Sequence, residues 1–281
     1  MSKKNFLKSL IFFISSLLGF VLILSLFVPK SDSELTRKDF LATEETKFFY
    51  VGLGDSLTEG VGDRTNQGGF LPLLSQLLTT TYDYDVSSSN YGVAGNTSKQ
   101  ILKRIQEKAD IKKDLVKADM MTLTIGGNDV MAVIRKNLTD LSVSSFAKPS
   151  QDYQDHLRQI IDLVRTDNDS LPIYILGIYN PFYLNFPEMT EMQDIINNWN
   201  NVTESVIVDY DNVYFVPIND LLYKGVDGEE GVVSTSGDQI TIDNDALFKE
   251  DHFHPNNIGY QIISDAVMEI INETKKDWTK N

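Results

Sequence analysis

Short apolar runs and segments with helical spacing alternate along most of this chain. Lys47 to Gly54 is rich in aromatic and aliphatic residues, which predicts a buried strand. From Gly68 to Thr80 leucines recur at intervals of three and four, which predicts a helix with one apolar face. Similar patterns predict strands at Val86–Val93, Asp119–Ile125, Pro172–Ile178 and Val213–Ile218, and helices at Ser98–Lys108, Asp152–Val164, Met189–Val208 and Asn257–Ile271.

Strands that alternate with helices predict an α/β fold with a parallel sheet covered on both faces. Sites in such sheets form outside the carboxyl ends of the strands. Ser56 follows the first predicted strand and Asn128 follows the third, so we expect both at the same edge of the sheet. Residues 224–246 are rich in Gly, Asp and Ser and predict a long loop, without the ligand spacing of a calcium-binding loop.

The N-terminal segment differs from the rest of the chain. No charged residue occurs between Leu10 and Val28, a run long enough to span a membrane as a helix, and Lys3, Lys4 and Lys8 precede it. This arrangement predicts an N-terminal transmembrane helix with a cytoplasmic N-terminus and an extracellular C-terminal domain. The alternatives are a cleaved signal peptide, which would release a secreted protein, and a buried core helix. The run lacks the Ala-x-Ala pattern of a cleavage site.

We therefore divide the chain into an anchor or signal segment (1–30), a polar tether (31–46) and one folded domain (47–281). The last part has roughly 240 residues, which fits a single α/β domain.

The composition limits the kinds of partner and site that this protein can have. The formal net charge is −15, and the first thirty residues carry four lysines and no acid, which leaves −19 for the remainder. Such an acidic domain repels phosphate backbones, so we expect no nucleic-acid partner. The chain has no cysteine, which excludes disulfides, thiolate catalysis and cysteine metal sites.

Two segments contain the groups needed for serine-type acyl transfer. Ser56 lies in Gly54-Asp55-Ser56-Leu57, and Asp251 and His254 lie just before Pro255. A serine hydroxyl needs an adjacent base, and the base needs a partner that orients it. Ser56 could instead cap a helix, and the second segment could be a polar loop in which Asp251 or Asn256 caps the last helix.

Asn128 and Gly95 are candidates for stabilising an oxyanion. Asn128 lies in Gly126-Gly127-Asn128-Asp129, and a side-chain amide aimed at a developing oxyanion contributes about a hundred- to thousand-fold in rate. Gly95 can offer its backbone N–H to the same charge. Each could alternatively serve only as a turn residue.

The chain contains three histidines, which limits the choice of base. His156 lies on a predicted amphipathic helix, where we expect a surface position. His252 is expected to be exposed rather than to support the site. A metal site of Asp251, His252 and His254 would lack a further ligand cluster.

These motifs together resemble the SGNH hydrolase superfamily, also called GDSL lipases and esterases. The resemblance rests on Gly54-Asp55-Ser56-Leu57, Gly95, Gly126-x-Asn128-Asp129 and Asp251-x-x-His254-Pro255, in this order, and covers about residues 47–275. The apolar N-terminus and the Asp-His-Phe-His-Pro-Asn ending are similar to membrane-anchored GDSL acylhydrolases of Gram-positive bacteria.

The resemblance implies a three-layer α/β/α sandwich with a flavodoxin-like parallel sheet. It also implies that Ser56 is the nucleophile, His254 the base and Asp251 its orienting partner. The oxyanion hole would comprise the N–H groups of Ser56 and Gly95 and the side chain of Asn128. The sequence shows no cofactor site and this mechanism needs none, so we expect no cofactor.

We therefore expect a serine-dependent carboxylic-ester hydrolase that acts on a lipid acyl ester or a lysophospholipid. The alternatives are an O-acetyl esterase for cell-wall glycans and a non-catalytic anchored binding module. Phe182 and Tyr183 follow the fourth predicted strand and are candidates for a substrate-binding wall, or for loop packing. Because the base must be neutral, activity should fall below a pH of roughly 6 to 7.

Overall fold

This computed structural model describes residues 8, 11–20, 46–137, 142–183, 190–223, 232–236 and 239–279. The chain divides into two units, Met1–Glu44 and Glu45–Asn281. In the first unit, residues 11–20 are helical. Much of the predicted anchor and nearly all of the tether lie outside the described residues. Within the described part of the chain, no helix combines the length and the apolar character needed to cross a bilayer.

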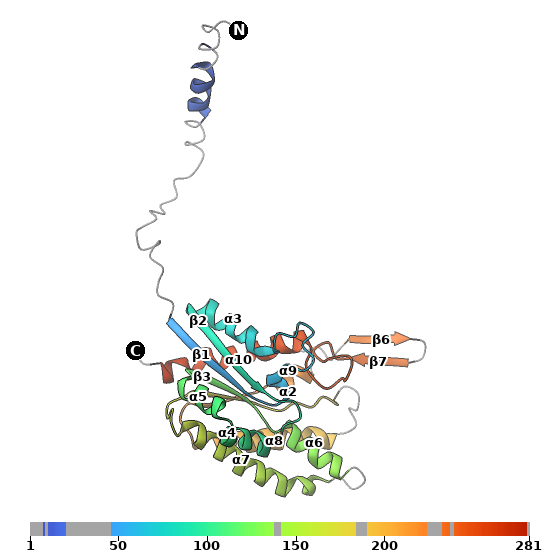
Figure 1. Cartoon of the computed structure of the whole chain (residues 1–281). Helices are drawn as coiled ribbons and strands as arrows, with labels where there is room; N and C mark the ends of the chain where they lie inside the picture. The colour runs from blue at the N-terminus through green and yellow to red at the C-terminus, as the bar shows by residue number, and fades with distance from the viewer. Residues whose placement is uncertain are drawn as a thin grey trace. The chain divides into compact units, whose positions relative to one another are not determined.

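The second unit is built on a five-stranded parallel sheet with the strand order β2-β1-β3-β4-β5 (Figure 1). This is the flavodoxin-like doubly wound order, so the predicted parallel sheet is confirmed. The strands are β1 (Thr46–Gly54), β2 (Tyr84–Gly92), β3 (Met120–Thr124), β4 (Ile173–Leu176) and β5 (Val213–Val216).

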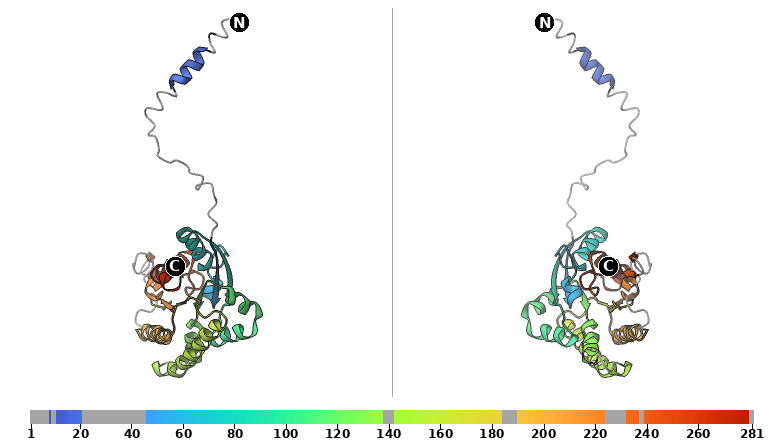
Figure 2. Two further views of the ribbon diagram at one scale, coloured as in Figure 1. Left: turned by 90° about the vertical axis from the view of Figure 1, so that its left-hand side faces the viewer. Right: turned by 90° about the vertical axis from the view of Figure 1, so that its right-hand side faces the viewer.

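Helices cover both faces of this sheet (Figures 1 and 2). One face packs against α3 (Phe70–Tyr82), α9 (Asn219–Tyr223) and α10 (Asn257–Trp278). The other packs against α4 (Ser98–Glu107), α5 (Ala109–Lys117), α7 (Ala147–Arg165) and α8 (Thr190–Ile207). Two apolar cores result, one on each side of the sheet.

The alternation of side chains along β1 shows how one strand feeds both cores. Phe48 and Tyr50 belong to the core beneath α3 and α10, whereas Val51 and Leu53 belong to the core on the opposite face. Successive side chains of a strand point to opposite faces, so a strand covered on both sides must be apolar at nearly every position. This explains the continuous apolar run that predicted β1.

Several elements differ from the sequence-based expectation. The predicted loop at 224–246 is wrong in part, because β6 (Val232–Ser236) and β7 (Gln239–Asp243) pair as an antiparallel hairpin. Their β-branched residues flank a Gly-Asp dipeptide, a hairpin signal. Elements not predicted are α2 (Ser56–Glu59), α5, α6 (Gly127–Lys136), the 3-10 helix η1 (Val143–Phe146) and α9.

Two predicted helices are longer than expected. Helix α7 begins five residues before the predicted start and holds Pro149 in its first turn, where a missing N–H does no harm. Helix α10 continues to Trp278, seven residues beyond the predicted end. Both α7 and α10 thereby cover more of the sheet than their apolar spacing indicated.

Candidate active site

Ser56 lies where β1 meets α2, at the carboxyl edge of the sheet. It is the first residue of α2, and Asp55 is the N-cap, whose Oδ1 accepts a hydrogen bond from the Leu57 N–H at 3.1 Å. The same Oδ1 accepts from the Thr124 hydroxyl at 2.8 Å, at the end of β3. Burial raises the pKa of Asp55. Only 5% of Ser56 is exposed, so its hydroxyl faces a confined space.

Gly54 permits this turn because β1 and β3 approach closely there. A Cβ at Gly54 would lie 2.1 Å from Thr124 Oγ1 and 2.6 Å from the Thr124 carbonyl oxygen. Any larger residue would therefore force the strands apart directly beside Ser56. The Gly54 carbonyl also accepts from the Val93 N–H at 3.1 Å, which ties the segment after β2 to the same place.

The loop before α10 brings His254 and Asp251 to Ser56. His254 Nε2 lies 2.9 Å from Ser56 Oγ, and His254 Nδ1 lies 2.6 Å from Asp251 Oδ2. The other carboxylate oxygen of Asp251 accepts from the backbone N–H groups of Phe253 and His254, at 2.9 and 3.0 Å. Residues 198 positions apart in sequence thus form one hydrogen-bonded chain.

The hydrogen bonds to Asp251 keep it charged. Burial alone would raise its pKa, but the His254 ring and the two backbone N–H groups outweigh burial, and the pKa lies below the ordinary value. A charged carboxylate on Nδ1 fixes the ring so that Nε2 can accept a proton from Ser56. The alternative capping role also exists in this loop, because Asn256 caps α10 by accepting from Ile258 and Gly259.

Asn128 reaches the same site from the start of α6. Its amide Nδ2 donates to the carbonyl of Asn96 at 3.0 Å, and its side chain lines the cavity that contains Ser56. Gly95 adopts φ +77° in the loop between β2 and α4. The Glu59 carboxylate accepts from the Ala94 N–H and so holds that loop against α2. Asn128 thus lies at the first turn of α6, beside Ser56 in the cavity, and Gly95 lies on a loop tied to α2, the helix that Ser56 begins.

Near these two donors lies a partly buried polar network that the sequence analysis did not identify. Ser98 Oγ donates to Asp129 Oδ1 at 2.6 Å, and the Ser98 N–H donates to Asp129 Oδ2 at 2.8 Å. His156 Nδ1 lies 2.9 Å from Ser98 Oγ. Burial raises the pKa of Asp129. The network joins the start of α4, next to Gly95, to the start of α6, next to Asn128.

The positions of the other histidines follow from this geometry. The surface position expected for His156 is wrong. His156 lies on α7, is half-buried, and its ring contacts the Ser98 hydroxyl. His252 is exposed, as expected, and adopts φ 51°. Across the part of the chain that the structure describes, no group of three or more histidine and carboxylate side chains is arranged to hold a metal ion.

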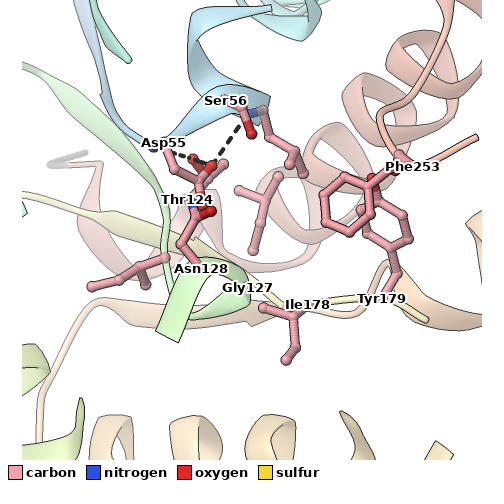
Figure 3. A pocket seen from close by; sticks show the side chains of 12 residues that line it. Asp55, Ser56, Thr124, Gly127, Asn128, Ile178, Tyr179 and Phe253 are labelled. Atoms are coloured by element: carbon pink, nitrogen blue, oxygen red, sulfur yellow. Dashed lines mark hydrogen bonds between the residues drawn. The ribbon is translucent and has the colours of Figure 1, made fainter. Parts of the chain in front are cut away.

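A narrow, mostly apolar cavity opens beside Ser56 (Figure 3). Ser56, Asp55, Thr124 and Asn128 lie on one side, and Ile178, Tyr179 and Phe253 face them across it. The unfilled space, with its open mouth, is about 450 Å³. Phe182 borders a neighbouring cavity and packs against Phe253 with ring centroids 6.2 Å apart. Tyr183 instead packs on Tyr223, with centroids 4.3 Å apart, and lines neither cavity.

Known proteins resemble this chain in sequence and in fold. The profile of the GDSL-like Lipase/Acylhydrolase family matches residues 53–262. The uncharacterized protein YpmR of Bacillus subtilis (strain 168) is 28% identical over 242 residues, which cover 86% of this chain and 88% of that protein.

Solved structures share the fold. The lipase Lip_vut3 from a goat rumen metagenome superimposes with a TM-score of 0.64 at 21% identity, over 79% of this chain and 96% of that one. A catalytic mutant of the acetylxylan esterase Axe2 from Geobacillus stearothermophilus gives a TM-score of 0.54 at 18% identity, over 84% and 98% of the two chains.

Proposed function

Because this chain belongs to the GDSL-like lipase/acylhydrolase family and is therefore a carboxylic-ester hydrolase, we propose that it works through an acyl-enzyme on Ser56. The observation that carries the proposal is the chain of hydrogen bonds from Asp251 through His254 to Ser56, with contacts of 2.6 and 2.9 Å. A nucleophile, a base and a group that orients the base are the parts such a mechanism requires.

The first half of the reaction forms the acyl-enzyme. His254 Nε2 takes the hydroxyl proton as Ser56 Oγ attacks the ester carbonyl. The carbonyl oxygen becomes an oxyanion, for which the donors are the N–H groups of Ser56 and Gly95 and the amide of Asn128. The bond to the leaving oxygen then breaks, and the departing alcohol takes the proton from His254.

The second half returns the free enzyme. A water molecule gives a proton to His254 and attacks the acyl carbon, and the same donors stabilise the second oxyanion. The bond to Ser56 Oγ then breaks, the serine recovers its proton from His254, and a carboxylic acid leaves. Throughout, the charged Asp251 stabilises the imidazolium that forms transiently, which its lowered pKa supports.

We propose a lipid acyl ester or a lysophospholipid as the substrate. The apolar lining of the cavity beside Ser56 supports an acyl group of this kind. A second candidate substrate is the O-acetyl group of a cell-wall glycan, since the space beside Ser56 alone is large enough for an acetyl group. A non-catalytic anchored binding module is the least supported alternative, because none of the proposed catalytic side chains is missing.

We also propose that the N-terminal segment anchors the protein in the cell membrane by a single span, with the catalytic domain outside the cell. The uncharged run from Leu10 to Val28 and the lysines before it support this arrangement. Secretion after cleavage of that segment is the alternative. Fractionation of cells distinguishes the two, because a protein found only in the medium would contradict anchoring.

The test of the mechanism is reaction of the purified protein with a fluorophosphonate probe, which labels activated serines. We expect labelling and ester hydrolysis in the wild type and neither in Ser56→Ala. Ser264→Ala is the matched control, because Ser264 is also buried but lies on α10 away from the site. Hydrolysis that survives in Ser56→Ala would contradict the proposal, and an unlabelled, folded wild type would favour the binding module.

A further inference from the structure

A second cavity adjoins the one that contains Ser56. The two share four wall residues, Gly127, Ile178, Tyr179 and Phe253. The second is lined further by Val130, Met131, Ile134, Pro181, Phe182, Met192 and Ile196, and its unfilled space, with its open mouth, is about 300 Å³. Because these four residues line both cavities, the second cavity lies next to the first, on the side of Ile178 and Phe253.

The lining of the second cavity offers no charge and no unused hydrogen-bonding side chain. The single side chain there with a polar atom other than sulfur is Tyr179, and its hydroxyl donates to the Phe253 carbonyl at 2.5 Å. Burial raises the pKa of Tyr179 well above its ordinary value, so the hydroxyl stays neutral. A sugar ring would leave its hydroxyls without partners here, which is costly, whereas an alkyl chain has none to satisfy.

We propose that the second cavity binds the distal part of an alkyl acyl chain whose carbonyl carbon lies at Ser56. The inference rests on the proposed acyl-enzyme mechanism and narrows its substrate class to medium- or long-chain acyl esters. The first cavity then holds the carbons next to the carbonyl, and the chain passes Ile178 and Phe253 into the space bounded by α6, α8 and the residues after β4.

Phe253 connects this binding step to the catalytic loop. Its ring lies edge-on to His254, with centroids 5.1 Å apart and planes at 75°, and its carbonyl is the acceptor for Tyr179. The ring also packs against Phe182. The dividing wall between the cavities is therefore part of the segment that holds the base, and its position is fixed by contacts with His254, Phe182 and Tyr179.

Met131 provides the test, because it lines only the second cavity and lies one turn beyond Asn128 on α6. Met131→Trp should fill that cavity, and Met131→Ala should enlarge it. Ala132→Trp is the matched control, since Ala132 is the next residue on the same helix and is exposed. The readout is kcat/KM of the full-length protein for the p-nitrophenyl esters of acetate, butyrate, octanoate and dodecanoate.

We expect the wild type to prefer octanoate over acetate, since each buried methylene contributes about fourfold in kcat/KM. In Met131→Trp, octanoate should lose about tenfold or more while acetate stays within about twofold. Met131→Ala should shift the preference toward dodecanoate, and Ala132→Trp should match the wild type.

Three results would overturn the inference: a wild type that prefers acetate, a parallel loss for all four esters in Met131→Trp, and a Met131→Ala profile like that of the wild type. In each case the proposed acyl-enzyme mechanism would still be supported if Ser56→Ala abolished hydrolysis of every ester. Hydrolysis that persisted in Ser56→Ala would instead contradict the mechanism itself.

Discussion

Replacing Asp63 should destabilise the fold, and the size of the loss in stability follows from the hydrogen bonds of its side chain. Its side chain is 8% exposed and accepts six of them. Oδ1 accepts from the Thr65 N–H, the Thr65 hydroxyl and the Asn257 amide, at 2.6 to 2.8 Å. Oδ2 accepts from three consecutive backbone N–H groups, those of residues 67–69, at 3.0 to 3.1 Å. One carboxylate thus joins the segment after α2 to the first residue of α10.

The perturbation is Asp63→Asn. The amide can keep its oxygen on the three backbone donors and turn its NH2 toward Thr65 and Asn257, whose hydroxyl and amide oxygen can accept. The Thr65 N–H then loses its acceptor, and so does the Arg64 N–H, which now donates to the Asn257 amide oxygen, although water can reach both of these exposed residues. Three hydrogen bonds to a charged oxygen become bonds to a neutral one, each weaker by roughly 1 kcal/mol, so the total cost is about 3 kcal/mol.

The assay is urea unfolding followed by the fluorescence of Trp199 and Trp278, with thermal unfolding in parallel. A loss of about 3 kcal/mol should lower Tm by roughly 6 to 12 °C in a domain of this size. Asp85→Asn is the matched control, because Asp85 is exposed on β2, and we expect a change within about 0.5 kcal/mol.

The pH dependence gives the reasoning a second check. Burial raises the pKa of Asp63, but the hydrogen bonds from Thr65, Gly69 and Asn257 outweigh burial, and the pKa lies well below its ordinary value. A depressed carboxyl pKa contributes stability that is present above the unfolded-state value of about 3.9 and is lost as the pH falls through the folded-state value. The difference in free energy of unfolding between wild type and Asp63→Asn should therefore be largest at pH 5 to 7 and shrink below about pH 4. A loss of unfolding free energy that is constant with pH, or that is no larger than the loss caused by Asp85→Asn, would refute this reasoning.

Three further predictions concern catalysis. Asn128→Ala should lower kcat by about a hundred- to thousand-fold with a smaller change in KM; a raised KM at unchanged kcat would instead indicate a role in substrate binding. Ser98→Ala should lower kcat by roughly tenfold at unchanged chain-length preference, because the Gly95 and Asn128 loops lose their link; wild-type kcat would contradict that role. Activity should fall below a pH of roughly 6 to 7 as an imidazole protonates. Asp251 stays charged over this range because its pKa is lowered. A pH–activity profile whose acid midpoint lies near 4 or below would rule against His254 as the base.

The layered fold could be predicted because each buried strand is apolar at nearly every position. Leu53 and Tyr50 face different cores, and both signals are local in the sequence. The hairpin of β6 and β7 was missed although its β-branched residues alternate with polar ones, because the abundance of Gly, Asp and Ser in 224–246 favoured a loop. Helices α5 and α6 were missed because their apolar faces are short.

The candidate site could be predicted only in part. Asp251 and His254 are three residues apart, so their pairing is a local property, and the strand-end positions of Ser56 and Asn128 place both at one sheet edge. The Ser98–Asp129–His156 network joins residues up to 58 positions apart across three helices. No local pattern encodes such a contact. The role of Phe253 as a wall also depends on the position of its loop against Tyr179, which only the packed structure supplies.

Ser56 and His254 lie far apart in the sequence, and this separation sets how early during synthesis the site can be complete. Ser56 is made early, whereas His254 follows 198 residues later, in a loop that becomes fixed when α10 packs against α3. At about 5 to 20 residues per second, a ribosome needs roughly 10 to 40 s to add those residues. During that time the serine has no base beside it. Under the proposed mechanism, a growing chain that still lacks His254 therefore cannot hydrolyse the esters around it, and the site is complete only once the loop before α10 is in place.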